Sequence, residues 1–247
     1  MASAIPAYIE SRIRQHPPID LPVVARSTPV VAFGDVTKAS VATLGWNPSK
    51  LEFLDNNGNE LTGTDRRLET LTSLGVDDLS AASRNVVRRV FEGCNGYFLR
   101  SPYRKWFDVL EKVLRRLDVS YYTGTACHLD LVQWATDPTW GKLRRIHRES
   151  LIEPDLSFLR QQLSQENVRL LLLNGSGIAK AYKKTLDCDL DERLIPGDLG
   201  LKLYIGQTPQ RARVIGWNKN LQSSFGVSNE YIKAVGAAVE RARSEAG

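Results

Sequence analysis

The sequence predicts an α/β fold, a three-layer sandwich in which helices flank a central, mostly parallel sheet of four strands. Short apolar segments alternate with amphipathic segments of helical periodicity, which favours a parallel sheet covered by helices. The leucine run at 170–173 is typical of a buried parallel strand. Several apolar segments end in polar turns, as strands do at the ligand-binding edge of such sheets. We expect one domain over residues 1–247.

The elements of the first half begin with residues 1–38, which are rich in proline and are expected to pack on the domain as an extension. Ser101 and Pro102 are suited to the N-cap and the first position of the last helix in this half. The predicted elements are a helix at 6–15, a strand at 40–44, and helices at 65–74, 80–92 and 103–117.

The second half contains the clearest alternation. The predicted elements are a strand at 121–125 or slightly longer, a helix at 155–165, a strand at 168–173, a helix to about 185, strands at 201–205 and 213–216, and a helix at 229–243. The two strands at 201–216 are expected to form a hairpin or to follow one another in the sheet.

Composition and charge restrict the class of protein. Hydrophobic residues at 42% and charged residues at 25% are ordinary globular values. Neither a membrane span nor a signal peptide is evident, so we expect a cytoplasmic protein. Three widely spaced cysteines without a CxxC pair indicate neither a disulfide framework nor a zinc site, and no metal is expected. The net charge of +5 favours a polyanionic partner, although basic clusters such as 142–148 are equally consistent with solvated helix faces.

The most informative segment, Gly45-Trp46-Asn47-Pro48-Ser49, ends the first predicted strand. Asn-Pro forces a turn, because the residue before proline is pushed out of the helical region. The turn holds the Asn47 amide at the carboxyl end of a strand, where open α/β sheets bind ligands. Late in the chain, the strand at 213–216 leads in the same way into Trp217-Asn218-Lys219-Asn220-Leu221.

Together these two junctions resemble the paired active-site motifs of the uracil-DNA glycosylase superfamily. The resemblance implies a monomeric, monofunctional DNA glycosylase that flips a base out of double-stranded DNA and hydrolyses its N-glycosidic bond. Asn47 matches the Gly-x-Asn-Pro form of the first motif and would orient the attacking water, since an amide cannot serve as a general base. The four-cysteine iron–sulfur signature of some branches is missing, so no cofactor is expected.

The second motif of the family is His-Pro-Ser-Pro followed by an apolar wedge. Aligning the wedge with Leu221 puts Trp217 at the His position, and sliding by one residue puts Asn218 there; neither alignment recovers the prolines. Asn218 is then the candidate donor to the departing base. The candidate contacts to the DNA backbone are Ser49, Lys50, Ser176, Lys219 and Ser223.

The base pocket implied by the resemblance includes Trp46, Phe53, Asn174 and Trp217. Trp46 or Phe53 would stack on the flipped base, or both are ordinary core aromatics. Asp130 is the best counterpart of the residue that reads the base, with His128 as the alternative reader. A carboxylate accepts hydrogen bonds only, which suits the exocyclic amine of cytosine better than O4 of uracil. An ion pair or cap for Asp130, and a core position for His128, are the structural alternatives.

These positions favour the branch that excises glucosylated hydroxymethylcytosine from phage DNA as an antiviral defence. A uracil or mismatch repair glycosylase is the first alternative. A non-catalytic nucleic-acid-binding module and a nucleoside hydrolase are further alternatives from other classes, and substrate size distinguishes the last, since a nucleoside hydrolase does not need polymeric DNA.

Overall fold

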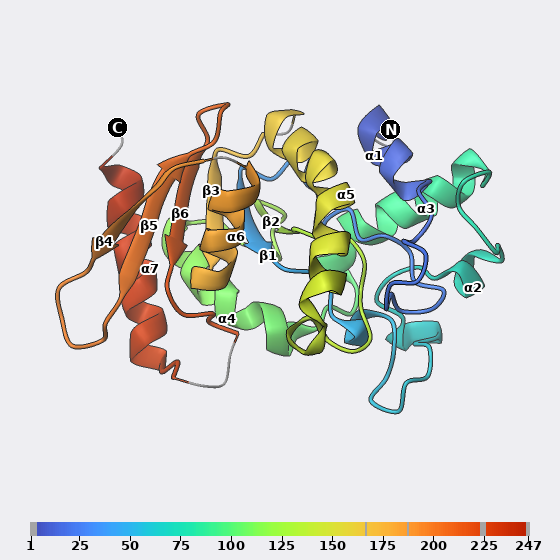
Figure 1. The fold of residues 1–247 in the computed structure, drawn as a ribbon, viewed down its shortest axis with the longest axis horizontal. Coiled ribbons are helices and arrows are strands. Elements are labelled where there is room, and N and C mark those ends of the chain that lie inside the picture. Colours follow the sequence, from blue (N-terminus) through green and yellow to red (C-terminus); the bar gives the residue numbers. More distant parts are fainter. Residues whose placement is uncertain (1–3, 166, 187, 223–225, 246–247) are drawn as a thin grey trace. The chain divides into compact units, whose positions relative to one another are not determined.

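The computed structural model describes residues 4–165, 167–186, 188–222 and 226–245 (Figure 1). The chain divides into two compact units, each assembled from three segments. Unit 1 comprises residues 1–35, 46–103 and 129–161. Unit 2 comprises residues 36–45, 104–128 and 162–247.

The sheet belongs to unit 2, apart from the last residues of one strand. Its six strands have the order β2-β1-β3-β6-β5-β4. Neighbours β1, β3 and β6 are parallel, whereas β5 runs antiparallel to both β6 and β4. The strands are β1 (Val41–Gly45), β2 (Ala126–Asp130), β3 (Leu170–Asn174), β4 (Leu190–Leu194), β5 (Lys202–Gln207) and β6 (Arg213–Trp217).

The α/β class and the mostly parallel sheet are confirmed, but the expected number of four strands is wrong. Of the two alternatives for the segment 201–216, the hairpin is the one observed, as β5 and β6. Five strand segments appear among the predicted elements, and the observed strand without a counterpart there is β4, whose sequence Leu-Asp-Glu-Arg-Leu has charged residues at its centre. It is an exposed edge strand, and Lys202 Nζ on β5 pairs with Glu192 at 2.6 Å. A polar edge strand carries no apolar periodicity, so hydrophobic patterning does not reveal it.

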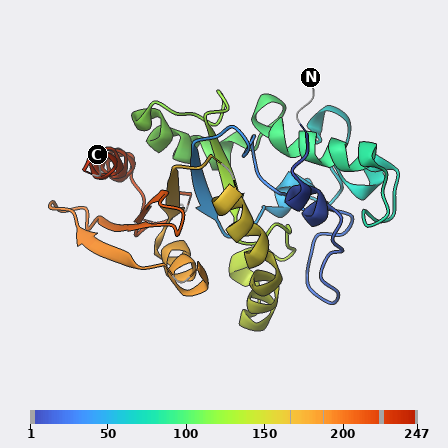
Figure 2. The same cartoon turned by 90° about the horizontal axis from the view of Figure 1, so that it is seen from above.

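Unit 2 is a three-layer arrangement. Helix α6 (Ser176–Leu186) lies on one face of the sheet, and α4 (Arg104–Leu114) and α7 (Asn229–Ser244) lie on the other (Figure 2). All residues of β3 are buried between these layers. The core therefore forms where the leucine run predicts it.

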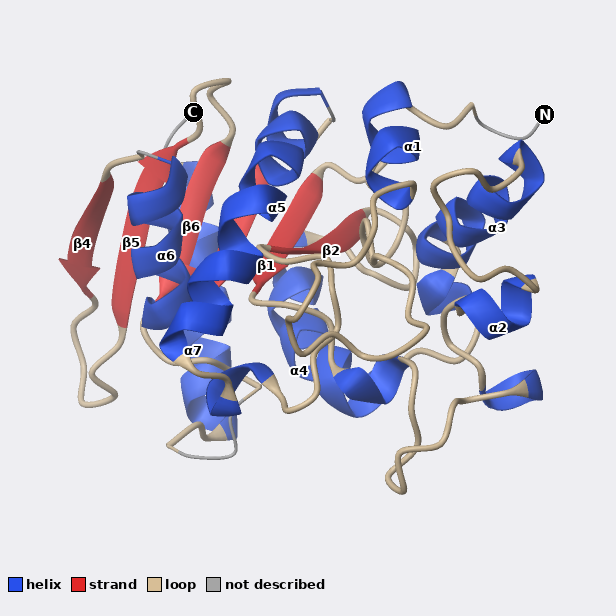
Figure 3. Cartoon of the chain, turned by 45° about the vertical axis from the view of Figure 1, so that its right-hand side comes forward, coloured by secondary structure: helices blue, strands red, loops and turns tan. Residues whose placement is uncertain are grey.

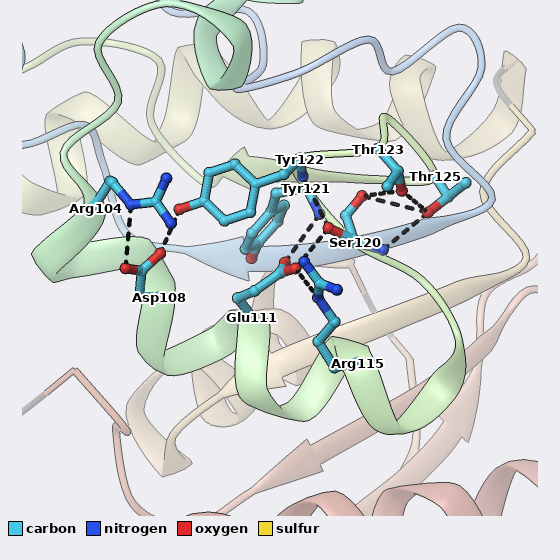
Figure 4. Close-up of polar contacts among 9 residues, drawn as sticks. All are labelled: Arg104, Asp108, Glu111, Arg115, Ser120, Tyr121, Tyr122, Thr123 and Thr125. Carbon is cyan, nitrogen blue, oxygen red and sulfur yellow. Dashed lines mark hydrogen bonds and ion pairs between the residues drawn. The ribbon is translucent and has the colours of Figure 1, made fainter.

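The strand predicted at 121–125 is wrong in its position. This segment is a turn, and the strand lies at Ala126–Asp130 instead. Side chains take the backbone N–H groups that a sheet would need: Ser120 N donates to Thr125 Oγ1 at 2.8 Å, and Tyr121 N donates to Glu111 Oε2 at 3.0 Å (Figure 4). Arg115 Nε holds the other Glu111 oxygen at 2.6 Å. Local side-chain hydrogen bonds compete here with strand formation.

Unit 1 is built mainly of helices and loops (Figure 3). Its helices are α1 (Ala7–Ile13), α2 (Leu71–Leu74), α3 (Arg84–Asn95) and most of α5 (Arg145–Gln165). The helix predicted at 65–74 is reduced to α2, because Thr70 and Ser73 form a reciprocal capping box that starts the helix at Leu71. Helix α5 starts well before residue 155 and passes through Pro154.

A buried ion pair links distant segments of unit 1. Arg12 Nη2 lies 2.9 Å from Asp155 Oδ1, and Arg12 Nε donates to Gln133 Oε1 at 3.2 Å. The other Asp155 oxygen accepts from the Gln133 backbone N–H at 2.8 Å. These contacts join Arg12 of α1 to the segment 129–161 of the same unit. In the described part of the chain, no helix has both the length and the apolar character needed to cross a membrane.

Candidate functional site

The carboxyl ends of three strands meet at one edge of the sheet in unit 2. Leu44 of β1 is paired with Leu173 of β3, and Asn174 of β3 with Trp217 of β6, all in parallel register. The loops after these strands therefore start from the same edge, where α/β sheets bind ligands. The first of these loops continues into unit 1 and carries Asn47, whereas Asn218 remains in unit 2.

Asn47 is held firmly within unit 1. Its Nδ2 donates to the Trp134 carbonyl and to Thr136 Oγ1, both at 3.1 Å. The preceding residue is also fixed, since the Trp46 carbonyl accepts from Val132 N at 2.9 Å. Both amide protons of Asn47 are thereby used, which leaves Oδ1 as the atom that can accept a hydrogen bond from a water.

The two candidate stacking aromatics differ in position. Phe53 is only 1% exposed, so it is an ordinary core aromatic, the second of the two alternatives given for it. Trp46 is half-buried and stacks on Trp140, with ring centroids 5.3 Å apart and planes 22° from parallel. One face of Trp46 is thus already covered by another indole.

The candidate backbone contacts beside Asn47 have local partners. Ser49 Oγ accepts from Leu51 N at 3.2 Å and caps the short 3-10 helix η1 (Lys50–Glu52). Lys50 Nζ pairs with Asp137 Oδ1 at 2.9 Å on the surface. An exposed ion pair of this kind is weak, so Lys50 can exchange Asp137 for another anion at little cost.

Glu52 is a functional residue candidate that sequence reasoning missed. It is 1% exposed, and its Oε2 accepts from the Tyr97 hydroxyl at 2.6 Å. Burial raises the pKa of Glu52 to about 7, a shift that the Tyr97 hydrogen bond and the charge of Arg67 oppose and the charge of Asp130 reinforces. A carboxyl group that titrates near neutral pH beside a candidate motif is typical of functional sites. Only its burial identifies it, because nothing in the surrounding sequence distinguishes Glu52 from a surface acid.

The surroundings of Glu52 bring Asp130 into the same cluster. Asp130 is 6% exposed, and its backbone carbonyl accepts from Gln133 Nε2 at 2.8 Å. Arg67 donates to the Leu51 carbonyl and lies over the Tyr103 ring, 5.3 Å from its centroid. Two buried carboxyl groups and one guanidinium thus gather near the first motif within unit 1.

His128 occupies a core position in unit 2. It is 3% exposed, its Nδ1 lies 2.7 Å from Thr43 Oγ1, and its ring meets Phe107 edge-on. The Thr43 hydroxyl also contacts the Tyr121 hydroxyl. This is the arrangement of a satisfied structural histidine, so the structure supports the structural alternative for His128 over the role of base reader.

Asn174 organises the loop after β6. Its Oδ1 accepts from Trp217 Nε1 at 3.1 Å and from Leu221 N at 2.9 Å. Its Nδ2 donates to Asn220 Oδ1 at 2.9 Å and to Gln222 Oε1 at 2.8 Å. The amide is 4% exposed and fully used in holding this loop, so in this conformation it does not line a base pocket.

The second motif is held by hydrogen bonds and differs from the predicted arrangement. Leu221 is 2% exposed, which contradicts a wedge, because a wedge must project from the surface to enter the base stack. Trp217 is fully buried and its indole N–H is taken by Asn174. Asn218 donates to the Gly200 carbonyl at 2.9 Å, and its Oδ1 accepts from Lys202 N at 2.9 Å and from the Tyr231 hydroxyl at 2.7 Å.

The remaining predicted contacts lie around the start of α6. Ser176 N donates to the Asn218 carbonyl at 3.2 Å. Gly175 has a φ of +99°, and a Cβ there would lie 3.0 Å from Asn220 N, so only glycine fits. Lys219 Nζ lies 4.5 Å from the centroid of the Tyr231 ring and donates to the Gly226 carbonyl at 3.2 Å. Ser223 lies outside the described residues.

Comparisons with known proteins add no family to these observations. No family model matches the chain, and no curated protein matches it. Within the described residues, no group of three or more His, Cys, Asp or Glu side chains is placed to hold a metal ion.

Proposed function

We propose that the chain is a monofunctional DNA glycosylase that hydrolyses the N-glycosidic bond of a flipped, modified pyrimidine in double-stranded DNA. The proposed base is glucosylated hydroxymethylcytosine of phage DNA, and the proposed role is antiviral defence. The observation that carries the proposal is the fixed amide of Asn47, whose two protons are held by Trp134 and Thr136.

The chemistry follows from what an amide can do. The bond between C1′ and the base nitrogen breaks with its electron pair going to the base, and a water then bonds to C1′ and loses a proton, which solvent passes to the departing base. Asn47 Oδ1 orients this water but cannot take its proton at neutral pH. The transition state therefore resembles an oxocarbenium ion, and the enzyme lowers the barrier through positioning and electrostatics.

The base is proposed from the chemistry of Asp130. An ionised carboxylate accepts a hydrogen bond from the exocyclic amine of a cytosine derivative. Against O4 of uracil it would place two acceptors together in a buried setting, which costs free energy. The polar loop that starts at Asp55 is proposed to accommodate the glucose, since its residues 56–59 are exposed while Asp55 Oδ1 accepts from Asn57 N and Asn59 N at 2.8 Å.

A non-catalytic nucleic-acid-binding module is the second candidate. It is favoured by the second motif, in which Asn174 and Asn218 are engaged in holding loops and Leu221 is buried. This candidate predicts binding to DNA without release of any base.

The test is incubation with duplexes that carry one uracil, one hydroxymethylcytosine or one glucosylated hydroxymethylcytosine, followed by alkaline cleavage. Strand cleavage at the glucosylated base by the wild-type protein, but not by Asn47→Ala, is the expected result. DNA binding without cleavage of any duplex would favour the module. Release of base from free nucleosides would instead establish a nucleoside hydrolase.

A further inference from the structure

The segment from Trp140 to Ile146 in unit 1 combines exposed cations with an exposed aliphatic side chain. Lys142, Arg144 and Arg145 are all exposed, and Ile146 is 59% exposed. Between them, Leu143 is buried in a cluster with Val132, Trp134 and Leu151. The buried Leu143 side chain therefore anchors the backbone of the segment, while the charged side chains and Ile146 are exposed to solvent.

This segment is attached to the loop that carries Asn47. Trp140 stacks on Trp46, and Asn47 Nδ2 donates to Thr136 Oγ1 at 3.1 Å. Lys50 pairs with Asp137, just before the segment. Aromatic, amide and ionic contacts thus connect the two segments within one compact unit. The segment 140–146 and the loop that carries Asn47 therefore lie side by side.

Two cations of the segment, Lys142 and Arg144, are not neutralised by the protein. The flanking acids already have partners, because Asp137 pairs with Lys50 and Glu149 lies 3.7 Å from Arg145. Lys142 and Arg144 form no ion pair with any acid in the described parts of the chain. Two unpaired cations beside an exposed aliphatic side chain match a nucleic acid, which offers phosphates outside and a stack of bases within.

We infer that the segment 140–146 is the element of unit 1 that contacts the DNA strand, with Lys142 and Arg144 on phosphates and Ile146 entering the base stack. Ile146 then performs the wedge role that the buried Leu221 does not fill. The inference rests on the proposed function for its partner, a DNA duplex. An anionic membrane surface is the competing partner for a basic and apolar segment, and the experiment separates the two.

The charge contribution is tested with the variant Lys142→Ala/Arg144→Ala and the matched control Lys180→Ala/Lys184→Ala, which removes two exposed cations of α6. Binding to an unmodified duplex is measured by fluorescence anisotropy over a range of salt concentrations. Loss of two phosphate contacts lowers the slope of log K against log[salt] by about 2 and weakens binding roughly tenfold or more at low salt. The control keeps the wild-type slope.

The apolar contribution is tested with Ile146→Ala and the matched control Leu194→Ala, a second exposed aliphatic residue, which lies on β4. A duplex with 2-aminopurine next to the target base reports flipping by its fluorescence, whether or not the base is released. Ile146→Ala is expected to reduce the fluorescence rise several-fold and to retain affinity for the duplex. Leu194→Ala is expected to leave both unchanged.

The outcomes separate the inference from the proposed function. If both double variants bind DNA alike, or if Ile146→Ala flips the base normally, the inference is overturned while base release remains to be judged by Asn47→Ala. If the wild-type protein binds phosphatidylserine vesicles and not DNA, the segment is a membrane contact and the inference fails. Loss of DNA binding in Lys142→Ala/Arg144→Ala without base release by the wild type supports the segment and overturns the glycosylase.

Discussion

The hydroxyl of Tyr97 donates a 2.6 Å hydrogen bond to Glu52 Oε2 and accepts one from the Tyr103 backbone N–H at 2.9 Å. The bond joins η3 (Tyr97–Leu99) to η1, which follows the Asn47 turn. Burial and the neighbouring carboxylate raise the pKa of Tyr97 far above its usual range, so it remains a donor at any physiological pH. The pair therefore holds η1, which follows the first motif, against η3, which follows α3. This contact persists in either protonation state of Glu52.

Glu52 is predicted to make stability depend on pH. Its pKa rises from 4.5 to about 7 on folding, so between these values the folded protein keeps a proton that the unfolded chain releases. The free energy of unfolding should therefore fall as pH rises through this window, by about 3 kcal/mol from this group. Urea unfolding of wild type and Glu52→Gln from pH 4.5 to 8 measures the difference. An identical pH dependence of the two proteins would contradict the assignment.

Asn47→Ala is predicted to lower the single-turnover rate of base release about a hundredfold, because the water loses its orienting acceptor. DNA affinity should change little, since Asn47 carries no charge. Thr136→Val is the graded control: it removes one of the two partners of Nδ2 and should produce a smaller loss of rate. Equal rates for Asn47→Ala and the wild type, with the fold intact by circular dichroism, would remove Asn47 from the mechanism.

Asp130→Asn is predicted to change selectivity. An amide can both donate and accept, so the variant should release the cytosine derivative more slowly or accept uracil more readily. Competition between duplexes with uracil and with glucosylated hydroxymethylcytosine gives the ratio directly. Efficient uracil release by the wild type, with none of the modified cytosine, would refute the role of Asp130 and the antiviral proposal.

Asn174→Leu is predicted to destabilise unit 2 by about 2–4 kcal/mol, because the N–H groups of Trp217 and Leu221 lose their acceptor in a buried setting. Asn220→Ala removes only one partner of Asn174 and should cost about 1 kcal/mol. Urea denaturation followed by tryptophan fluorescence compares the two variants. A loss no larger for Asn174→Leu than for Asn220→Ala would show that the four contacts of Asn174 are not cooperative.

Asp155→Leu is predicted to destabilise unit 1 by about 3–5 kcal/mol, since it leaves the Arg12 charge buried without an acid to neutralise it. Burial already lowers the pKa of Arg12 and raises that of Asp155, and their ion pair opposes both shifts. Arg12→Met/Asp155→Leu removes both charges and should recover part of the loss. Thermal unfolding of the three proteins tests this, and a double variant less stable than Asp155→Leu would refute it.

The sequence predicts those elements whose signal is hydrophobic. The leucines of β3 and the turn at Asn47-Pro48 indicate a strand and a strand end without reference to the rest of the molecule. The turn at 120–125 is different, because its outcome depends on Glu111, a residue of another element that takes the N–H of Tyr121. Patterning within a short window contains no information on such a partner.

The candidate site, too, is predicted from the sequence only where the signal is local. The Asn-Pro turn places Asn47 at a strand end, but the burial of Glu52 and the full engagement of Asn174 depend on side chains from several segments. The wedge prediction for Leu221 is wrong for this reason: its spacing in the sequence is suitable, yet the Asn174 oxygen fixes its backbone so that the side chain is buried.

The contacts of Asn174 restrict insertions and deletions in the loop after β6. A single amide oxygen binds Trp217 at the end of β6 and Leu221 beyond it, so the number of residues between these two positions is fixed. An insertion or deletion there moves one donor away from the oxygen and buries it without a partner. Natural or engineered variation of this loop should therefore occur after Gln222, where the constraint of the shared acceptor ends.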